Sequence, residues 1–418
     1  MKLRDFRTVK DLKGKRVLVR VDFNVPLRQA PNGKGYEVDP HGDWRIRRSL
    51  PTIQKLSDAG AVVILATHVG RPGGTVHEEL RVRPMGYRLS ALLREEGVPN
   101  EVIWTNFERH EGRKGERQIL IAPDCIGVHA EEVIDHAREG DIVLLENIRF
   151  HAGEEANDIE FAKALSSSAD YFINDQLGMS HRKHASVAAI TALLPHYAGT
   201  LLIDEVEHLE RITERAARPF TLILGGAKIT TKMPLLAHLL PLADHVHIGG
   251  AAANTLLSYA GKPVGKSVVA LGHESVQKLP GWEKVKLPVD AVVAKDASGT
   301  AIRTCAIDEV RPDEYIFDVG PETCAAIEQD AAASKLVVWN GPLGYFEVPN
   351  FAKMTERLAR AMAEWKNERI IGGGDTEDVV EKVGVRDRMS FVSTGGGAML
   401  SFLSGEELPG ITPLIVEK

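Results

Sequence analysis

Residues 17–27 read VLVRVDFNVPL, an apolar run that ends in the polar residues Asp22 and Asn24. Short runs rich in valine, isoleucine and leucine recur along the chain, and most of them are followed by a segment with helical periodicity. This alternation predicts parallel strands joined by crossover helices. The expected strands lie at residues 17–23, 62–66, 142–145, 171–173, 220–224, 245–248, 336–339, 369–371 and 390–392.

The connecting segments carry apolar residues at intervals of three or four, the periodicity of a helix with one buried face. The clearest sets are Leu50, Ile53 and Leu56, and Phe351, Met354, Leu358 and Met362. Two stretches rich in charge, glycine or proline, residues 28–42 and 105–117, break this rhythm. We interpret them as surface insertions.

A chain of 418 residues exceeds what one hydrophobic core usually serves, which favours two domains. Both halves show the same strand-and-helix pattern, so we expect two doubly wound, Rossmann-like α/β domains with mainly parallel sheets, joined by a hinge. Pro195 and Gly199 interrupt the pattern near the middle of the chain. The expected division is residues 1–186 with 404–418, a connecting segment at 187–204, and a second domain at 205–403.

The composition, 44% hydrophobic and 26% charged, is ordinary for a globular protein. A net charge of −7 provides no general attraction to nucleic acid or to anionic membranes. The three cysteines include no close CxxC pair, which indicates reduced thiols. Residues 1–15 lack a signal-peptide core, and no stretch approaches about 18 apolar residues. We expect a cytoplasmic monomer without nucleic-acid or membrane partners.

In open α/β sheets, ligands bind beyond the carboxyl ends of the strands. The expected strand ends of the first half carry Asp22, Asn24, His68, Arg71, Arg149, His181 and Arg182. One such arginine alone is more often a solvated surface charge. Several at equivalent strand ends predict a pocket for a small, multiply charged anion, because a guanidinium binds carboxylate or phosphate through two parallel hydrogen bonds.

The expected strand ends of the second half are rich in glycine instead. They carry Gly225, Gly226 and Lys228, then Gly249 and Gly250, then Asn340 and Gly341, then residues 372–375, then residues 395–397. A single glycine pair usually marks a tight turn. Repeated clusters favour a phosphate-rich ligand, because bare backbone N–H groups approach oxygen atoms closely. Asp375 follows three glycines and is a candidate ligand for a hard cation such as magnesium.

Two local motifs resemble a P-loop and a metal site, but their context favours neither function. Residues 261–267, GKPVGKS, lack one residue of the P-loop spacing and follow a helix-like stretch rather than a strand. The sequence HRKH at residues 181–184 resembles a metal pair, but its place at a strand end among arginines favours anion binding or loop packing. Protein-kinase HRD and DFG signatures and a GxSxG elbow are absent from the sequence.

Over nearly its entire length the chain resembles the phosphoglycerate kinase family. The resemblance is carried by ten ordered segments: VLVRVDFNVPL (17–27), WRIRRSLPTI (44–53), HVGRP (68–72), LLENIRFHAGEE (144–155), FINDQLGMSHRKHAS (172–186), LGGAKITTK (224–232), HIGGAAANTLL (247–257), VVWNGPLGYFE (337–347), IIGGGDT (370–376) and STGGGA (393–398).

Carried over position by position, the resemblance implies three sets of residues. An acid-substrate pocket is implied at Asp22, Phe23, Asn24, Arg45, His68, Val69, Gly70, Arg71, Arg149 and Arg182. A nucleotide site is implied at Gly226, Lys228, Lys232, Gly249, Gly250, Asn340, Pro342, Glu347, Gly373, Gly374, Asp375 and Thr376, with Glu347 as ribose ligand and Asp375 as magnesium contact. Catalytic roles fall on Arg45, Lys228, Gly373 and Gly396.

The chain departs from the family pattern at several positions. The family usually has alanine and phenylalanine at Gln176 and Leu177, glycine and methionine at Ala251 and Ala252, and serine and glutamate at Met399 and Ser401. Residues 28–42 and 105–117 are also longer than the common loops of the family. None of these departures removes a charged substrate ligand. They bear on the packing behind the anion pocket and on the shape of the adenine slot.

The resemblance implies reversible phosphoryl transfer between 1,3-bisphosphoglycerate and ADP, giving 3-phosphoglycerate and ATP, with Mg²⁺ on the nucleotide. The attacking carboxylate is already ionised at neutral pH, since its reference pKa is near 4, so a general base is not required. The protein must align the reactants and stabilise charge in a direct in-line transfer. With ligand sets in two domains, we expect closure about the hinge.

Two other classes of protein share some of these features. A noncatalytic metabolite-binding protein would use the same arginines and glycines but would not need Lys228 beside a magnesium carboxylate. An NAD-dependent dehydrogenase would also be doubly wound, but no expected strand leads into GxGxxG with an acidic residue about 20 positions on. A coupled assay for phosphorylation of 3-phosphoglycerate discriminates among the three.

Overall fold

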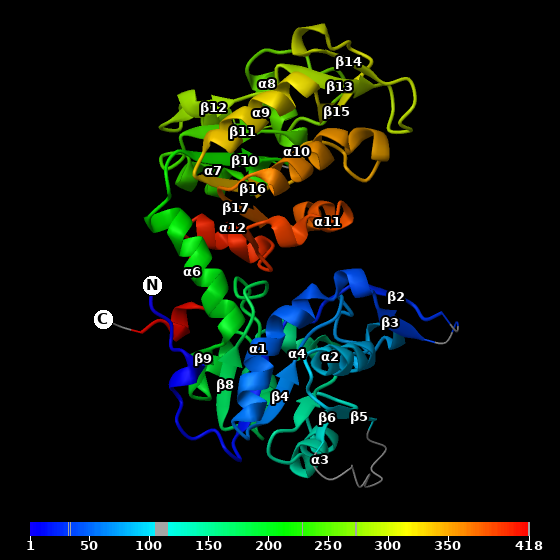
Figure 1. Ribbon diagram of the computed structural model, residues 1–418, viewed down its shortest axis with the longest axis vertical. Coiled ribbons are helices and arrows are strands. Elements are labelled where there is room, and N and C mark those ends of the chain that lie inside the picture. Colours follow the sequence, from blue (N-terminus) through cyan, green and yellow to red (C-terminus); the bar gives the residue numbers. More distant parts are fainter. Residues whose placement is uncertain (32, 34, 105–115, 228, 272–273, 417–418) are drawn as a thin grey trace. The chain divides into compact units, whose positions relative to one another are not determined.

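The structure, a computed structural model, describes residues 1–418 apart from residues 32, 34, 105–115, 228, 272–273 and 417–418. It divides into two compact units (Figure 1). Unit 1 comprises Met1–Glu207 and Glu407–Lys418, and unit 2 comprises His208–Glu406. Both units are α/β with mainly parallel sheets, which confirms the predicted fold class.

Unit 1 is built on a seven-stranded parallel sheet with the strand order β5-β6-β7-β4-β1-β8-β9. Its strands are β1 (Arg16–Arg20), β4 (Val62–Ala66), β5 (Asn100–Trp104), β6 (Arg117–Ile121), β7 (Ile142–Leu144), β8 (Tyr171–Asn174) and β9 (His196–Ala198). Four of them coincide with predicted strands, although β1 ends at Arg20 rather than at residue 23. The sequence pattern misses the edge strands β5 and β9, which are only partly buried and lack continuous apolar runs. It also misses β6, although Ile119, Leu120 and Ile121 are buried.

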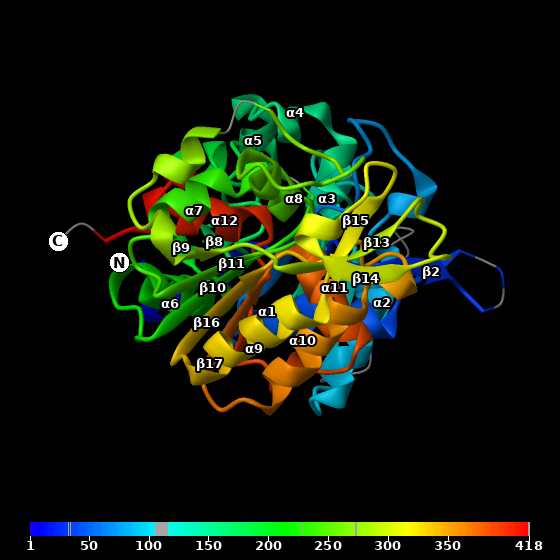
Figure 2. The ribbon, with the colours of Figure 1, turned by 90° about the horizontal axis from the view of Figure 1, so that it is seen from above.

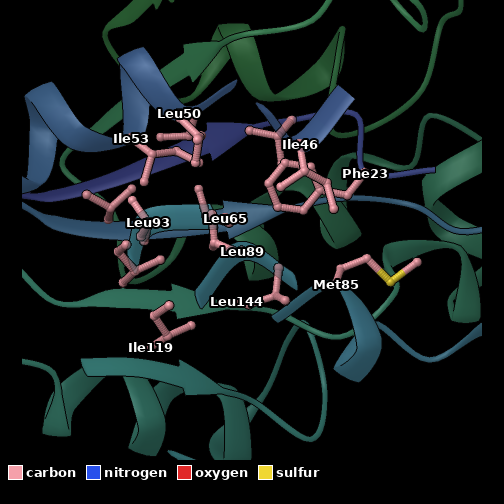
Figure 3. Close-up of a cluster of buried hydrophobic side chains, with 14 of the residues drawn as sticks. Phe23, Ile46, Leu50, Ile53, Leu65, Met85, Leu89, Leu93, Ile119 and Leu144 are labelled. Atoms are coloured by element: carbon pink, nitrogen blue, oxygen red, sulfur yellow. The ribbon is translucent and has the colours of Figure 1, made fainter. Parts of the chain in front are cut away.

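Helices cover both faces of this sheet. They are α1 (Trp44–Asp58), α2 (Arg83–Glu95), α3 (Val128–His136), α4 (Ala152–Glu155) and α5 (Ile159–Ser166). Figure 3 shows Leu50 and Ile53 of α1 packing with Leu89 of α2 over Leu65 and Leu144 of the sheet. Strand residues that alternate with these face the other way and pack with α3 and α5. The predicted apolar face of α1 is therefore confirmed, and the sheet is doubly wound.

The two predicted insertions have different outcomes. Within residues 28–42, β2 (Leu27–Gln29) and β3 (Tyr36–Val38) form an antiparallel hairpin whose described residues are mostly exposed. Residues 105–115 lie outside the described residues. Arg117 opens β6, so the second predicted insertion extends one residue too far.

Unit 2 contains a six-stranded parallel sheet with the order β12-β11-β10-β16-β17-β18. Its strands are β10 (Phe220–Leu224), β11 (His245–Ile248), β12 (Val285–Lys286), β16 (Leu336–Asn340), β17 (Glu368–Gly372) and β18 (Phe391–Val392). Five of these strands match the sequence pattern to within one residue at each end. A small antiparallel sheet, β14-β13-β15, was not predicted and consists of β13 (Asp290–Ala294), β14 (Arg303–Ala306) and β15 (Tyr315–Val319).

The helices of unit 2 lie on both faces of the parallel sheet. They are α7 (Met233–Leu239), α8 (Gly250–Tyr259), α9 (Pro321–Ala333), α10 (Lys353–Glu364), α11 (Gly374–Lys382) and α12 (Gly397–Leu403). Figure 2 shows α9 and α10 on one face, where Leu358 and Met362 join the core, and α7 and α12 on the other. Phe351 of the predicted helical face lies in a 3₁₀ turn before α10.

The helix α6 (Thr200–Glu214) connects the edge strand β9 of unit 1 to the sheet of unit 2, and the division between the units falls inside α6. The stretch 261–267 is a turn after α8, in which the Lys266 N–H donates to the Glu314 carbonyl at 2.7 Å. In the described part of the chain, no helix is both long and apolar enough to cross a membrane.

Candidate active site

The carboxyl ends of β1 and β4 bring several predicted acid-site residues together. Arg45, in the first turn of α1, donates from Nη1 to Asp22 Oδ2 at 3.0 Å, and its guanidinium lies over the Trp44 ring. The Gly70 N–H donates to Asn24 Oδ1 at 2.9 Å. Periodicity alone marks Arg45 as a surface residue. Its bond to a carboxylate that is 5% exposed places it at the strand ends with the others.

Arg149 extends this cluster from the neighbouring strand β7. It sits in a 3₁₀ turn (Ile148–Phe150), is 7% exposed, and donates from Nη1 to the Gly70 carbonyl at 2.7 Å. Asn147 ties the same loops together, because its Oδ1 accepts from the N–H groups of Val69 and Arg149. The buried guanidinium is thus held by the loop after β4 and by Glu155 of α4, whose Oε1 lies 3.3 Å from its Nε.

Arg71 and Arg182 are the exposed members of the set. Burial lowers the pKa of Arg149, and the charge of Arg71 acts in the same direction, so these two cations lie close enough to interact. The Arg182 N–H donates to the Met179 carbonyl, and the Met179 sulfur lies 3.8 Å from Arg149 Nη2. The structure therefore gathers the predicted cations of unit 1 at one edge of its sheet.

A buried ionic network lies behind this cluster, and the sequence pattern gave no sign of it. Arg20, which is fully buried on β1, donates from Nε to Ser186 Oγ at 2.9 Å. Ser186 Oγ donates in turn to Glu154 Oε1 at 2.7 Å. Burial raises the pKa of Glu154, but its bonds with His184 and Ser186 and the charge of Arg20 outweigh burial and lower it. Glu154 is therefore an anion that balances Arg20.

Arg20 also determines which ring nitrogen of His68 carries the hydrogen. Its Nη2 lies 3.2 Å from His68 Nδ1, and a guanidinium can only donate, so Nδ1 accepts. Burial and then the charges of the neighbouring arginines lower the pKa of His68 well below its usual range. His68 is therefore neutral with its hydrogen on Nε2, which makes it a donor to an anionic ligand.

In unit 2 the glycine-rich strand ends enclose a cavity of about 310 Å³. It is lined by Gly226, Ala227, Lys232, Asn340, Gly341, Gly373, Gly374, Asp375, Thr376, Gly396, Gly397 and Leu400. Lys232 is 9% exposed and its ammonium donates to Asn340 Oδ1. Burial lowers the pKa of Lys232 to about 8, although the charge of Asp375 acts in the opposite direction. A buried ammonium among backbone N–H groups suits phosphate oxygens.

Two glycines of this cavity need the conformational freedom of glycine. Gly373 precedes α11 with φ of 94°, and Gly396 precedes α12 with φ of 49°. A Cβ at Gly373 would also lie 2.9 Å from Asn340 Nδ2. Gly372, one residue earlier, touches Met399, whose sulfur would lie 1.9 Å from an added Cβ. The departure at Met399 thus fills space behind the glycine turn.

A second cavity, of about 290 Å³, adjoins the first, because Gly226, Ala227 and Asp375 line both. Its walls are mainly apolar and include Ala251, Leu343 and Phe317. Gly250, Pro342 and the exposed Glu347 also line it. An apolar slot joined to a glycine-lined cavity matches the two ends of a nucleotide.

Two predicted nucleotide residues are not placed in these cavities. Lys228 lies outside the described residues. Gly249 precedes α8, and a Cβ there would lie 2.7 Å from Leu343 Cδ2, so its small size permits close packing of the strand end. The departure at Gln176 is buried and satisfied: its Oε1 accepts from the Met179 N–H at 2.6 Å and its Nε2 donates to Asn174 Oδ1.

A model of the family described as phosphoglycerate kinase matches residues 6–406. A phosphoglycerate kinase from Dictyoglomus turgidum is 42% identical over 413 residues, covering 97% of this chain and 96% of that protein. The solved phosphoglycerate kinase structure from Coxiella burnetii has a TM-score of 0.78 at 35% identity and covers 99% of both chains. The one from Pyrococcus horikoshii OT3 has a TM-score of 0.80 at 28% identity, covering 99% of this chain and 98% of that one.

These findings agree along nearly the whole chain, in sequence and in fold. The chain therefore belongs to the phosphoglycerate kinase family and catalyses reversible phosphoryl transfer between 1,3-bisphosphoglycerate and ADP, which gives 3-phosphoglycerate and ATP.

Proposed function

We propose that the cation cluster of unit 1 binds the three-carbon acid and that the two adjoining cavities of unit 2 bind the nucleotide. The observation that carries this division is the groove of unit 2, where an apolar slot meets a glycine-lined cavity at Asp375. An adenine ring fits an apolar wall, and phosphates fit backbone N–H groups beside a lysine. Unit 1 offers arginines, a neutral histidine and Asp22, which suit a carboxylate, a phosphate and a hydroxyl.

Within unit 1 we assign the following roles. Arg149, Arg182 and Arg71 bind the charged groups of the acid, and His68 donates from Nε2. Asp22 and Asn24 accept a hydrogen bond from the hydroxyl of the acid, and both also accept hydrogen bonds from Arg45 and so orient it. Phe23, Val69 and Gly70 shape the pocket through their backbone. Arg45 and Lys228, with the backbone N–H groups around Gly373 and Gly396, stabilise charge on the transferring phosphoryl group.

Within unit 2 we assign Gly226, Lys232, Asn340 and Thr376 to the phosphate end and Gly249, Gly250 and Pro342 to the slot. Glu347, exposed at the rim, accepts from the ribose hydroxyls. Asp375 is an exposed carboxylate beside a phosphate-sized cavity, the kind of hard oxygen ligand that Mg²⁺ takes beside nucleotide phosphates. Mg²⁺ held there supplies positive charge to the phosphates when bound.

The two ligand sets belong to different units, and transfer requires near contact of the reacting atoms. We therefore propose closure about a hinge near residues 187–200, which also keeps water from the acyl phosphate. We further propose that the chain works as a monomer in the cytoplasm. The three cysteines are buried and free, which suits a reducing compartment.

A coupled assay tests the reaction directly. Purified chain is mixed with 3-phosphoglycerate and MgATP, and an added NADH-dependent dehydrogenase reduces the acyl phosphate to the aldehyde and inorganic phosphate. The oxidation of NADH then reports formation of the acyl phosphate. We expect a rate that saturates in both substrates. Nucleotide binding without turnover would favour the noncatalytic binding protein instead, and ATP hydrolysis without acyl phosphate would contradict transfer to the three-carbon acid.

The depressed pKa of Lys232 predicts proton uptake when ADP binds. Below about pH 8 the ammonium is charged, and above it the charge that attracts phosphate is lost. At pH 8 about half of the free protein carries neutral Lys232, so each ADP should take up roughly half a proton. Calorimetry of MgADP binding in two buffers of different ionisation enthalpy measures this number. The Lys232→Met variant should bind more weakly and show almost no uptake, and equal uptake in both proteins would exclude Lys232 as the titrating group.

A further inference from the structure

A cluster of potential metal ligands lies in unit 1 among residues that the phosphoryl transfer does not use. Asp124, Cys125 and His151 each present one ligand atom, and all three atoms lie within 4.8 Å of one another. His151 Nε2 is 2.7 Å from Asp124 Oδ1. Carboxylate oxygen, thiolate sulfur and imidazole nitrogen together form a ligand set typical of zinc.

The topology of the sheet explains why these residues meet. Asp124 and Cys125 follow β6, and His151 follows β7 after the 3₁₀ turn that contains Arg149. Because β6 and β7 pair in parallel, their carboxyl ends lie side by side. The side chains of His151 and Arg149 have different partners, since Arg149 contacts Gly70 and Met179. The cluster is thus separate from the proposed acid pocket although it shares a loop with it.

Burial in the cluster is graded from core to solvent. Cys125 is 2% exposed and packs in the hydrophobic core beneath α3 and α5, whereas the side chains of Asp124 and His151 are 43% and 31% exposed. A metal ion can therefore enter between the carboxylate and the imidazole and reach the sulfur from the solvent side. A larger substrate cannot reach the sulfur, which argues against a nucleophilic role for Cys125.

We propose that Asp124, Cys125 and His151 form a binding site for a borderline divalent cation of the zinc type. Zinc bonds of about 2.0–2.3 Å place tetrahedral ligand atoms roughly 3.3–3.7 Å apart. The 2.7 Å separation between Asp124 Oδ1 and His151 Nε2 must therefore widen slightly, whereas the upper limit of 4.8 Å for all three ligand atoms leaves room for this spacing. Binding displaces the thiol proton of Cys125 to solvent and moves the imidazole proton from Nε2 to Nδ1. Three protein ligands leave the fourth position to water.

The hard cations Mg²⁺ and Ca²⁺ prefer oxygen ligands and should not compete with zinc for this site.

Cobalt(II) is the probe for this site, because a thiolate bound to Co²⁺ produces a charge-transfer band in the near ultraviolet. The full chain, reduced and freed of metal by chelation, is titrated with Co²⁺ without nucleotide. We expect one equivalent to produce the band and added Zn²⁺ to remove it. Co²⁺ bound at Asp375 has no thiolate ligand and cannot produce it.

Two variants and two matched controls show whether Cys125 and His151 bind the Co²⁺ that produces the band. Cys125→Ala should abolish it, whereas Cys305→Ala and Cys324→Ala, which remove the other buried thiols, should keep it. His151→Asn retains the thiol and alters a partly exposed position, so it should fold normally and weaken Co²⁺ binding by at least about tenfold. Binding of 3-phosphoglycerate verifies that unit 1 is intact in Cys125→Ala and His151→Asn, and binding of MgADP verifies that unit 2 is intact in the two controls. Absence of the band in the parent chain, its survival in Cys125→Ala, or unchanged affinity in His151→Asn would overturn the proposal.

Discussion

Replacement of Lys228 by alanine is expected to lower kcat about a hundredfold to a thousandfold, with much smaller changes in the KM values for ATP and 3-phosphoglycerate. The size is typical of removing one group that stabilises charge in the transition state, about 3–4 kcal/mol. The sequence neighbours Gly226 and Ala227 line the phosphate cavity, and Lys232 lies in the same cavity. A group that acts mainly on the transition state affects kcat more than KM.

Steady-state kinetics with both substrates varied measures this effect. The matched control is Lys262→Ala. Lys262 is a surface lysine of the P-loop-like stretch 261–267, and its Nζ lies 3.0 Å from Asp308 Oδ1. The control should leave kcat and both KM values unchanged. If Lys228→Ala kept the parent kcat and raised only the KM for ATP, Lys228 would serve ground-state nucleotide binding, and the cations that stabilise the transition state would have to be sought elsewhere.

Replacement of Arg149 by alanine is expected to weaken binding of 3-phosphoglycerate about a hundredfold or more and to change the affinity for ADP less than about twofold. Loss of one partner from a buried, hydrogen-bonded charge pair costs about 2–5 kcal/mol. Arg149 is nearly buried and held by the Gly70 carbonyl, so it faces the ligand preorganised. Arg149→Lys keeps the charge but loses the planar fork, and should recover only part of the affinity.

Calorimetry with each ligand separately measures both affinities. Arg138→Ala is a suitable control because it removes an exposed arginine of the same unit. Partial recovery of 3-phosphoglycerate binding in Arg149→Lys would show that the loss in Arg149→Ala is not a folding defect of unit 1. Weakened ADP binding with unchanged 3-phosphoglycerate binding would contradict the proposed division of ligands between the units.

The central strands could be predicted from the sequence because parallel strands buried on both faces appear as continuous apolar runs. The bounds of β4, β10 and β11 agree with the pattern at both ends. The pattern failed at partly buried edge strands, and it also missed the buried runs of β6 and β13. The edge strand β5, NEVIW, alternates buried and exposed residues too irregularly to be distinguished from a loop. β9 has only three residues, and the small antiparallel sheet follows no crossover pattern.

The candidate site was predictable to the extent that its residues follow strands. His68, Arg149 and Asp375 each follow an apolar run within four residues. Arg45 stands at a helix start, and only the family resemblance singled it out. Arg20 was missed because a charged residue inside a strand is normally assigned to a solvated face. Its partners Ser186 and Glu154 come from distant segments, so the buried network emerges only from tertiary structure.

The most direct test of the account is a crystal structure of the chain with 3-phosphoglycerate and MgADP bound. We expect electron density for 3-phosphoglycerate against Arg149, Arg182 and His68 of unit 1. We also expect the ADP phosphates in the cavity lined by Gly373 and Lys232, with magnesium on Asp375 and the base in the adjoining apolar slot. Nucleotide density among the arginines of unit 1, or 3-phosphoglycerate bound only in unit 2, would contradict the division of labour on which the proposed mechanism depends.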